Sequence, residues 1–331
     1  MSRRPLRTVT LVTTVLAACA TQKPLFPSVS YRSQSGTLPT GMRVLAYETP
    51  STGLFSLAAS YRAGSADDLP GKEGLARLVA RLSLRHGGGG EGRLTYSQRL
   101  FAAGVRFDAQ AGRDSTEFLA SGPASRLGAA LAVEADRLRD PLAGMTEEDF
   151  RRERDLHAEE LAEQRLASRD DAGSQWLLEV ALGGAAYARP TDGTPEAVRA
   201  LTSEDARSWV RQRFTPAHLV VTATAPSGGT GVKVLRAFGT LATGEAEGVP
   251  AWARAAPPIP PPNFPVVTPD LGGGAEPAVR RAAVSGVQLW IGWVLAGEVS
   301  ADAPRALAAA ALVAEQAGGM QPTTHTHGAY G

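Results

Sequence analysis

The spacing of hydrophobic residues between positions 38 and 225 follows the periods of strands and helices in turn. Short β-compatible runs predict strands, namely 42–47, 54–62, 105–111, 116–121 and 219–225. Hydrophobic residues three and four apart predict helices, namely those near 75–82, 127–138, 146–168, 171–182 and 203–214. The first two strands are adjacent in the chain, which suggests the edge of a sheet with the first helix packed on it. The pattern therefore predicts a domain of the α+β class.

Local signals mark the ends of two of these helices. Ser203 is the expected N-cap of the helix that follows it, because its hydroxyl can accept a hydrogen bond from an unpaired backbone N–H. The run from Gly87 to Gly90 is expected to end the first helix, which leaves His86 as a loop residue. This glycine run lacks the GK[ST] ending of a phosphate-binding loop, so nucleotide binding is not expected there.

Composition divides the chain into five predicted segments. Residues 20–37 are rich in Ser, Gln, Thr and Pro, and prolines cluster again over 249–269, which favours an extended spacer. Beyond it, one strand at 288–295 and an Ala-rich helix at 303–317 bury too little surface for a robust domain. The expected organisation is a signal peptide over 1–18, a tether over 19–37, a first domain over 38–243, a linker over 244–278 and an incomplete second domain over 279–331.

Charge and cysteine content exclude several classes of function. The 34 Lys and Arg residues and 33 Asp and Glu residues leave a formal net charge of +1, so no overall field attracts nucleic acid or an acidic substrate. The chain's one cysteine cannot form an internal disulfide, a Cys-rich zinc site or a CxxC redox pair. We therefore expect no nucleic-acid partner.

The cysteine lies where a lipidation signal would place it. Three arginines within the first seven residues precede an uncharged run over 8–18, which is typical of a secretory signal and too short to span a bilayer. Leu16-Ala17-Ala18-Cys19 resembles the bacterial lipobox, whose cysteine is acylated after cleavage. We expect a cell-envelope lipoprotein anchored at Cys19, with Ala20 favouring the outer membrane, facing the periplasm. Sec and twin-arginine export stay open, and an ordinary cleavage site that releases a soluble protein is the alternative.

Several motifs of the first domain occur together in one order. They are Leu38-Pro39-Thr40-Gly41-Met42-Arg43-Val44, Ala63-Gly64-Ser65, Pro70-Gly71-Lys72-Glu73-Gly74-Leu75-Ala76, Tyr187-Ala188-Arg189-Pro190 with Gly193, and Leu201-Thr202 with Thr215-Pro216-Ala217-His218-Leu219. In this order they resemble the pitrilysin and insulinase family of inverzincin metallopeptidases, peptidase family M16, which includes the mitochondrial processing peptidases. The resemblance implies an antiparallel-rich sheet packed by helices, followed by a second αβ domain that is incomplete here.

The family's chemistry depends on an HxxEH motif in the first helix. The resemblance implies that its two histidines bind Zn²⁺, that the Glu between them is the base, and that a distant Glu completes the site. Here the matching positions are Arg77-Leu78-Val79-Ala80-Arg81. A guanidinium has no lone pair for a metal, and Ala80 cannot take a proton. We therefore expect no catalytic residue, no bound metal and no cofactor in this chain, although active relatives use zinc.

The distant acidic positions of the family are retained. Glu153 and Glu160 match them, with Glu160 at the third ligand, and their spacing places both on one helix face. We predict that Arg77 and Arg81 pair with Glu160, because an unpaired, partly buried carboxylate is costly. The first alternative is that all these groups are ordinary surface charges.

The second alternative is a displaced metal site made of Glu153, His157 and Glu160, whose side chains lie at helical spacing. His86 could join a metal site only by chance. His325 and His327, in the Thr-His-Thr-His segment, are also more typical of residues without a metal role.

The resemblance implies a catalytically inactive member of the family. We expect it to act as an accessory or peptide-binding subunit of an active M16 peptidase. One alternative is a zinc metalloendopeptidase that uses a partner's site or the displaced Glu/His/Glu set. Another is a truncated gene product with no function of its own.

Overall fold

The computed structural model describes residues 32–49, 53–86, 94–167, 172–182, 185–226 and 228–242. Cys19, the predicted linker and partial second domain, and the histidines at 325 and 327 lie outside these residues. No helix in the described ranges is both long enough and apolar enough to cross a membrane.

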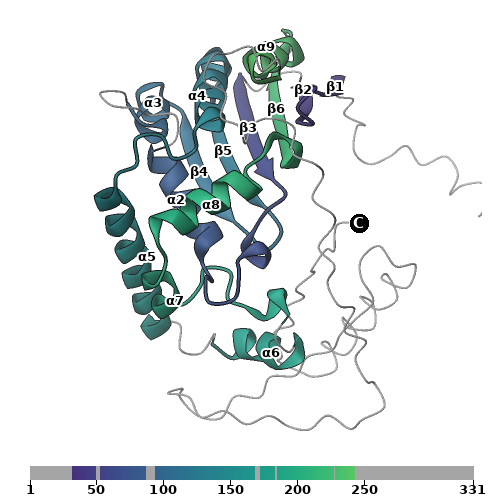
Figure 1. Ribbon diagram of the computed structural model, residues 1–331. Coiled ribbons are helices and arrows are strands. Elements are labelled where there is room, and N and C mark those ends of the chain that lie inside the picture. Colours follow the sequence, from purple (N-terminus) through teal and green to yellow (C-terminus); the bar gives the residue numbers. More distant parts are fainter. Residues whose placement is uncertain are drawn as a thin grey trace, which may run out of the picture. The chain divides into compact units, whose positions relative to one another are not determined.

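A six-stranded sheet forms the centre of the domain (Figure 1). Its strand order is β1-β2-β6-β3-β5-β4. The strands are β1 (Arg32–Thr37), β2 (Arg43–Thr49), β3 (Leu54–Tyr61), β4 (Arg106–Ala111), β5 (Thr116–Pro123) and β6 (Leu219–Pro226). β2 pairs with β6 in parallel, whereas β3 is antiparallel to both β5 and β6, and β4 is antiparallel to β5. The predicted antiparallel-rich sheet is therefore confirmed.

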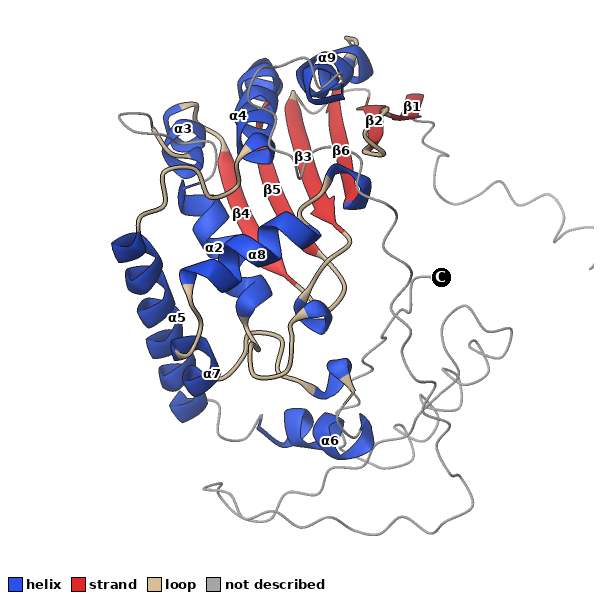
Figure 2. Cartoon of the chain, viewed as in Figure 1, coloured by secondary structure: helices blue, strands red, loops and turns tan. Residues whose placement is uncertain are grey.

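Helices pack on this sheet and on one another (Figure 2). They are α2 (Leu75–His86), α3 (Tyr96–Ala102), α4 (Leu127–Arg139), α5 (Glu147–Ala167), α6 (Ala172–Leu182), α7 (Pro195–Arg199), α8 (Ser203–Arg213) and α9 (Thr230–Ala242). α2 contacts the strands β4 and β5 and the helices α3, α5 and α8. The predicted α+β class is confirmed.

The core forms where the alternating residues of the strands meet the helices. In β3, Phe55, Leu57, Ala59 and Tyr61 are buried while the residues between them are more exposed, the period of two that a strand packed on one face requires. The sheet face is covered in part by α2, whose apolar residues recur at helical spacing; its buried residues are Leu75, Ala76, Leu78, Val79, Ala80, Leu82 and Ser83. Packing against the core therefore fixes the position of α2, the helix that contains Arg77 and Arg81.

A buried ion pair lies within this core. Arg137 on α4 is fully buried and forms an ion pair with Glu134, one helical turn earlier. Its guanidinium carbon lies 3.5 Å from the centroid of the Phe118 ring, and its Nη1 donates a hydrogen bond to the Ser83 hydroxyl at 3.4 Å. The charge is thus paired, hydrogen-bonded and stacked on an aromatic ring, which a buried guanidinium requires.

Some local expectations are wrong. The first two predicted strands, β2 and β3, do not form the edge of the sheet, because β1 lies outside β2 and β6, from far along the chain, lies between β2 and β3. The N-cap of α8 is Thr202 rather than Ser203: the Thr202 hydroxyl accepts from the Asp205 N–H at 3.2 Å. His86 is the last residue of α2, not a loop residue.

Among the described strands and α-helices, four were not predicted from the pattern: β1, α3, α7 and α9. β1 lies within the segment expected to be a tether, and all six of its residues are exposed, so no hydrophobic alternation marks it. α3 and α7 have seven and five residues, too short for a helical period to be recognised.

Candidate functional site

The helix that would carry the zinc motif, α2, is fixed at its start by Asp68. The Asp68 carboxylate is buried and accepts hydrogen bonds from the backbone N–H groups of Gly74 (3.0 Å) and Ala76 (2.9 Å). N–H groups at a helix start have no intrahelical partners, so the carboxylate acts as a cap. Burial raises the pKa of Asp68 to about 7, although both N–H donors and Arg189 act to lower it.

Two glycines bring a second loop against this helix start. A Cβ on Gly74, whose φ is +91°, would lie 2.5 Å from the carbonyl oxygen of Asp192. A Cβ on Gly193, whose φ is +80°, would lie 2.3 Å from the carbonyl oxygen of Glu73. Both positions therefore need glycine. The close approach places Asp192 beside the first turn of α2.

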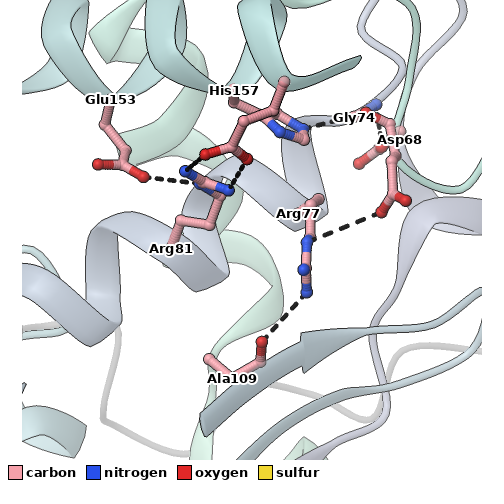
Figure 3. A network of polar contacts seen from close by, with 9 residues as sticks. Asp68, Gly74, Arg77, Arg81, Ala109, Glu153 and His157 are labelled. Carbon is pink, nitrogen blue, oxygen red and sulfur yellow. Dashed lines mark hydrogen bonds and ion pairs between the residues drawn. The ribbon is translucent and has the colours of Figure 1, made fainter. Parts of the chain in front are cut away.

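The three positions that replace the reactive residues of HxxEH have two kinds of environment. Ala80 is fully buried in the core. Arg77 and Arg81, one turn apart, have 30% and 17% of their side chains exposed. Figure 3 shows that the two guanidinium groups point to different partners, Arg81 toward Glu153 and Arg77 toward Ala109.

Arg81 binds two acidic residues of α5, Glu153 and Glu160. Its Nε donates to Oε1 of Glu153 at 2.6 Å, while Nη1 and Nη2 donate to the two carboxylate oxygens of Glu160 at 2.6 and 3.0 Å. Hydrogen bonds from Arg81 lower the pKa of Glu160. Burial acts to lower the pKa of Arg81, but the carboxylates of Glu160 and Glu153 outweigh it and raise that pKa. The predicted contact between Arg81 and Glu160 is present.

Glu153 is the more deeply buried of the two carboxylates, with 3% of its side chain exposed against 49% for Glu160. Its second oxygen, Oε2, forms an ion pair with Nε of Arg85 at 2.7 Å. Both oxygens of this buried group are therefore paired with guanidinium groups of α2, a role for Arg85 that the sequence reasoning missed. Arg85 lies four residues after Arg81, so the helical spacing carried the signal.

Arg77 does not form the predicted ion pair with Glu160. Its Nη1 donates to the backbone carbonyl of Ala109 in β4 at 3.1 Å, and its Nε lies 3.7 Å from Oδ1 of Asp192. These partners come from distant parts of the chain, so periodicity could not identify them. The prediction was therefore right for Arg81 and wrong for Arg77.

His157 lies on α5 between Glu153 and Glu160, but its ring contacts the loop at Asp192 rather than either carboxylate. Its side chain is 3% exposed, and Nε2 is 3.1 Å from the carbonyl oxygen of Asp192. Burial, followed by the charge of Arg81, lowers its pKa, so the ring is neutral at pH 7. A neutral ring next to a carbonyl donates its Nε2–H. His157 thus ties α5 to the loop at Asp192.

The side chains present do not fit a zinc ion. Zinc needs deprotonated sulfur, imidazole or carboxylate donors around one point. At the motif positions Arg77 and Arg81 offer only N–H donors, and the carboxylates of Glu153 and Glu160 are held by guanidinium groups. In the described ranges, no three His, Cys, Asp or Glu side chains are placed to hold a metal, and this includes the displaced set considered from the sequence.

Comparisons with known proteins agree on one family. The sequence profile of the insulinase family, peptidase family M16, matches residues 43–194. An uncharacterized zinc protease of Streptomyces coelicolor is 30% identical over 190 residues, which cover 56% of this chain and 40% of the relative. An uncharacterized zinc protease of Mycobacterium leprae is 28% identical over 185 residues, or 56% and 41% of the two chains. The chain thus spans less than half the length of these curated relatives.

Solved structures share the fold. A protease from Helicobacter pylori superposes with a TM-score of 0.57 at 18% identity, covering 67% of this chain and 53% of that one. A peptidase M16 inactive domain from Pseudomonas fluorescens gives a TM-score of 0.57 at 17% identity, covering 69% and 52%. The matched profile and the zinc protease relatives support the assignment of residues 43–194 to the insulinase family, peptidase family M16, and the solved structures agree with this assignment in fold.

Proposed function

We propose that this chain is a catalytically inactive M16 homologue, anchored in the bacterial cell envelope by a lipid on Cys19, where it serves as an accessory or peptide-binding subunit of an active M16 peptidase. One observation carries the loss of activity: the guanidinium of Arg81 binds Glu160, the residue that the family resemblance assigns as third zinc ligand, at 2.6 and 3.0 Å. A permanent cation thus takes the charge role of the metal.

The chemistry of the helix supports this assignment. Activation of water by zinc requires a metal that lowers the pKa of the bound water and a base that accepts its proton. Arg77 and Arg81 cannot bind the metal, and the buried methyl group of Ala80 cannot accept the proton. Both requirements of the reaction are missing from the same helix.

Metal content and peptide cleavage by the purified chain test the loss of activity. We expect less than stoichiometric zinc after dialysis and no chelator-sensitive cleavage of a fluorogenic peptide substrate. One zinc per chain together with turnover that a chelator abolishes would overturn the proposal.

The proposed accessory role needs an inactive domain, and an inactive domain has a precedent in this fold. The Pseudomonas fluorescens domain that shares it is described as inactive. Affinity purification of the intact chain from its own envelope tests this role. We expect an M16 peptidase with an intact HxxEH motif to co-purify, and its peptidase activity to fall when the chain is removed. An active peptidase that neither co-purifies nor responds to the chain would contradict the role.

Lipid anchoring is tested by metabolic labelling with an alkyne fatty acid. We expect the native chain to be labelled and to fractionate with the outer membrane. The variant Cys19→Ser should lose the label and leave that fraction. Labelling that persists in Cys19→Ser would rule out the proposed attachment.

A further inference from the structure

The strand next to α2, β4, lies at the edge of the sheet. Its one paired neighbour among the described strands is β5. An edge strand presents unpaired N–H and C=O groups to which another extended chain can add. In Figure 2, β4 is the last strand of the sheet on the side of α2 and α5, so the groups of this edge lie close to the altered motif.

The register of the β4–β5 hairpin defines which β4 groups face outward. The N–H of Gly112 donates to the carbonyl of Ser115 at 2.8 Å, so these two residues form a hydrogen-bonded pair. Such pairs alternate along antiparallel strands. Counting back from Gly112, residues 106, 108 and 110 direct their backbone groups to β5. The residues with outward groups are Phe107, Ala109 and Ala111.

Side chains of the same domain occupy both outward groups of the central residue. Nη1 of Arg77 donates to the Ala109 carbonyl at 3.1 Å, and the Ala109 N–H donates to Oδ1 of Asp108 at 2.8 Å. Gln110 holds Asp108 in place by donating from Nε2 to Oδ2 at 3.0 Å. Figure 3 shows the contact between Arg77 and Ala109. An incoming strand would therefore find the N–H and the carbonyl of Ala109 already hydrogen-bonded to side chains of this domain.

We infer that Arg77 and Asp108 close the β4 edge to extended peptides, and that Arg77 is the removable part of this closure. An added strand needs the carbonyl of Ala109 to complete its ladder, and a charged donor there is stronger than a neutral backbone N–H. Arg77 has a second partner nearby, because its Nε lies 3.7 Å from the half-exposed carboxylate of Asp192. Withdrawal toward Asp192 keeps the guanidinium paired while it frees the carbonyl.

The closure of the β4 edge and the loss of catalysis depend on different chemical groups. Loss of catalysis concerns metal ligands and a base, whereas the closure concerns a backbone carbonyl in β4. It does not rest on the proposed function, because an edge can be closed on an active or on an inactive domain. Its failure in an experiment would leave the zinc and peptidase results unchanged.

Fluorescence anisotropy with the full chain tests the closure. The probe is a fluorescein-labelled peptide of five Thr-Val repeats, which is suited to an added strand. We expect Arg77→Ala to bind it about tenfold more tightly than the native chain, the factor that one hydrogen bond to a charged group corresponds to. A peptide of the same length with proline at alternate positions should lose this gain, because proline cannot donate to a strand ladder.

Two matched variants isolate the contact. Arg85→Ala removes an arginine of the same helix that pairs with Glu153, and Asp192→Ala removes the ion pair of Arg77 but leaves Ala109 to bind it. Neither variant should bind the probe more tightly than the native chain does. If Arg77→Ala does not fold, as judged by circular dichroism, the test uses Arg77→Met instead, because methionine keeps an apolar side chain of similar length without the guanidinium. Equal binding by the native chain and the Arg77 variant, or an equal gain in Arg85→Ala, would overturn the inference.

Discussion

Arg81 on α2 donates two parallel hydrogen bonds to the carboxylate of Glu160 on α5, from Nη1 at 2.6 Å and from Nη2 at 3.0 Å. The remaining nitrogen, Nε, reaches the buried carboxylate of Glu153 at 2.6 Å. One guanidinium therefore joins two helices through two carboxylates, a geometry that suits the planar fork of arginine and not the point charge of lysine. The side chain at one of the positions that match the family's zinc motif thus links α2 to α5.

Replacing Arg81 by alanine is expected to destabilise the domain. The change leaves the buried carboxylate of Glu153 with Arg85 as its one cationic partner. Removing one partner of a fully buried pair costs about 3–5 kcal/mol, and the remaining partner and the partial exposure of the cluster reduce this to about 1–3 kcal/mol. Urea denaturation followed by circular dichroism measures the difference in the free energy of unfolding.

The control is Arg152→Ala, which removes an exposed helical pair with Glu148. Such pairs contribute roughly 0–1 kcal/mol, so this variant should unfold close to the native midpoint. If Arg81→Ala loses no more stability than Arg152→Ala, the link between α2 and α5 is not a stabilising one.

The two residues of α5 that bind Arg81, Glu153 and Glu160, should differ in how much their removal destabilises the domain. Glu153 is buried and holds two guanidinium groups, whereas Glu160 is half exposed. Glu153→Ala leaves Arg81 and Arg85 without their shared buried acceptor, and we expect it to lower the unfolding free energy by more than Glu160→Ala does. Parallel urea titrations provide the comparison. A larger effect of Glu160→Ala would show that the exposed pair is the dominant one.

Sequence reasoning predicted α2, α5 and the acidic face of α5 because each depends on residues within two or three helical turns. Glu153 and Glu160 are seven residues apart, so their common face follows from the helix period alone. The resemblance to the family implied that Glu160 faces the motif positions of α2, and the contact of Arg81 with Glu160 then followed from the physical cost of an unpaired carboxylate.

Features that depend on distant parts of the chain were missed. The carbonyl of Ala109 attracts Arg77 because the hairpin of β4 lies against α2, and no spacing in the sequence shows this. The position of β6 between β2 and β3 likewise follows from the parallel pairing of Arg43 with Val220. A local pattern identifies a strand but not its neighbours.

The cap of α2 should make stability depend on pH. Burial raises the pKa of Asp68 to about 7 in the folded chain, from 3.8 when unperturbed. Between these values the folded state binds more protons than the unfolded state, so the stability due to Asp68 is present at low pH and lost as the pH rises through 7. The slope is at most about 1.4 kcal/mol per pH unit.

Asp68→Asn isolates this contribution. The variant loses a cap acceptor and should be less stable overall, so the readout is the pH dependence of the difference between the native chain and the variant from pH 5 to 8.5. Three histidines with pKa values lowered by burial change stability in the opposite sense and cancel in that difference, namely His86, His157 and His218. A difference that does not vary with pH would show that Asp68 does not titrate in this range.

Restoring the two imidazoles should restore a metal site. Arg77→His together with Arg81→His places two rings one turn apart on α2 and releases Glu160, whose oxygens now lie within 2.6–3.0 Å of the Arg81 nitrogens. Two imidazoles and a carboxylate are a sufficient protein ligand set for zinc. We expect the double variant to bind one zinc per chain in calorimetric titration, where the native chain binds none at this helix.

The same variant separates metal binding from catalysis. Ala80 is unchanged, so no base is present beside the metal, and peptide cleavage should stay at the background rate although zinc is bound. Adding Glu160→Gln to the double variant should weaken zinc binding by one to two orders of magnitude or more, because a neutral amide replaces the anionic ligand. Zinc affinity that does not depend on residue 160 would mean that α2 and α5 do not face each other as the Arg81 contacts require.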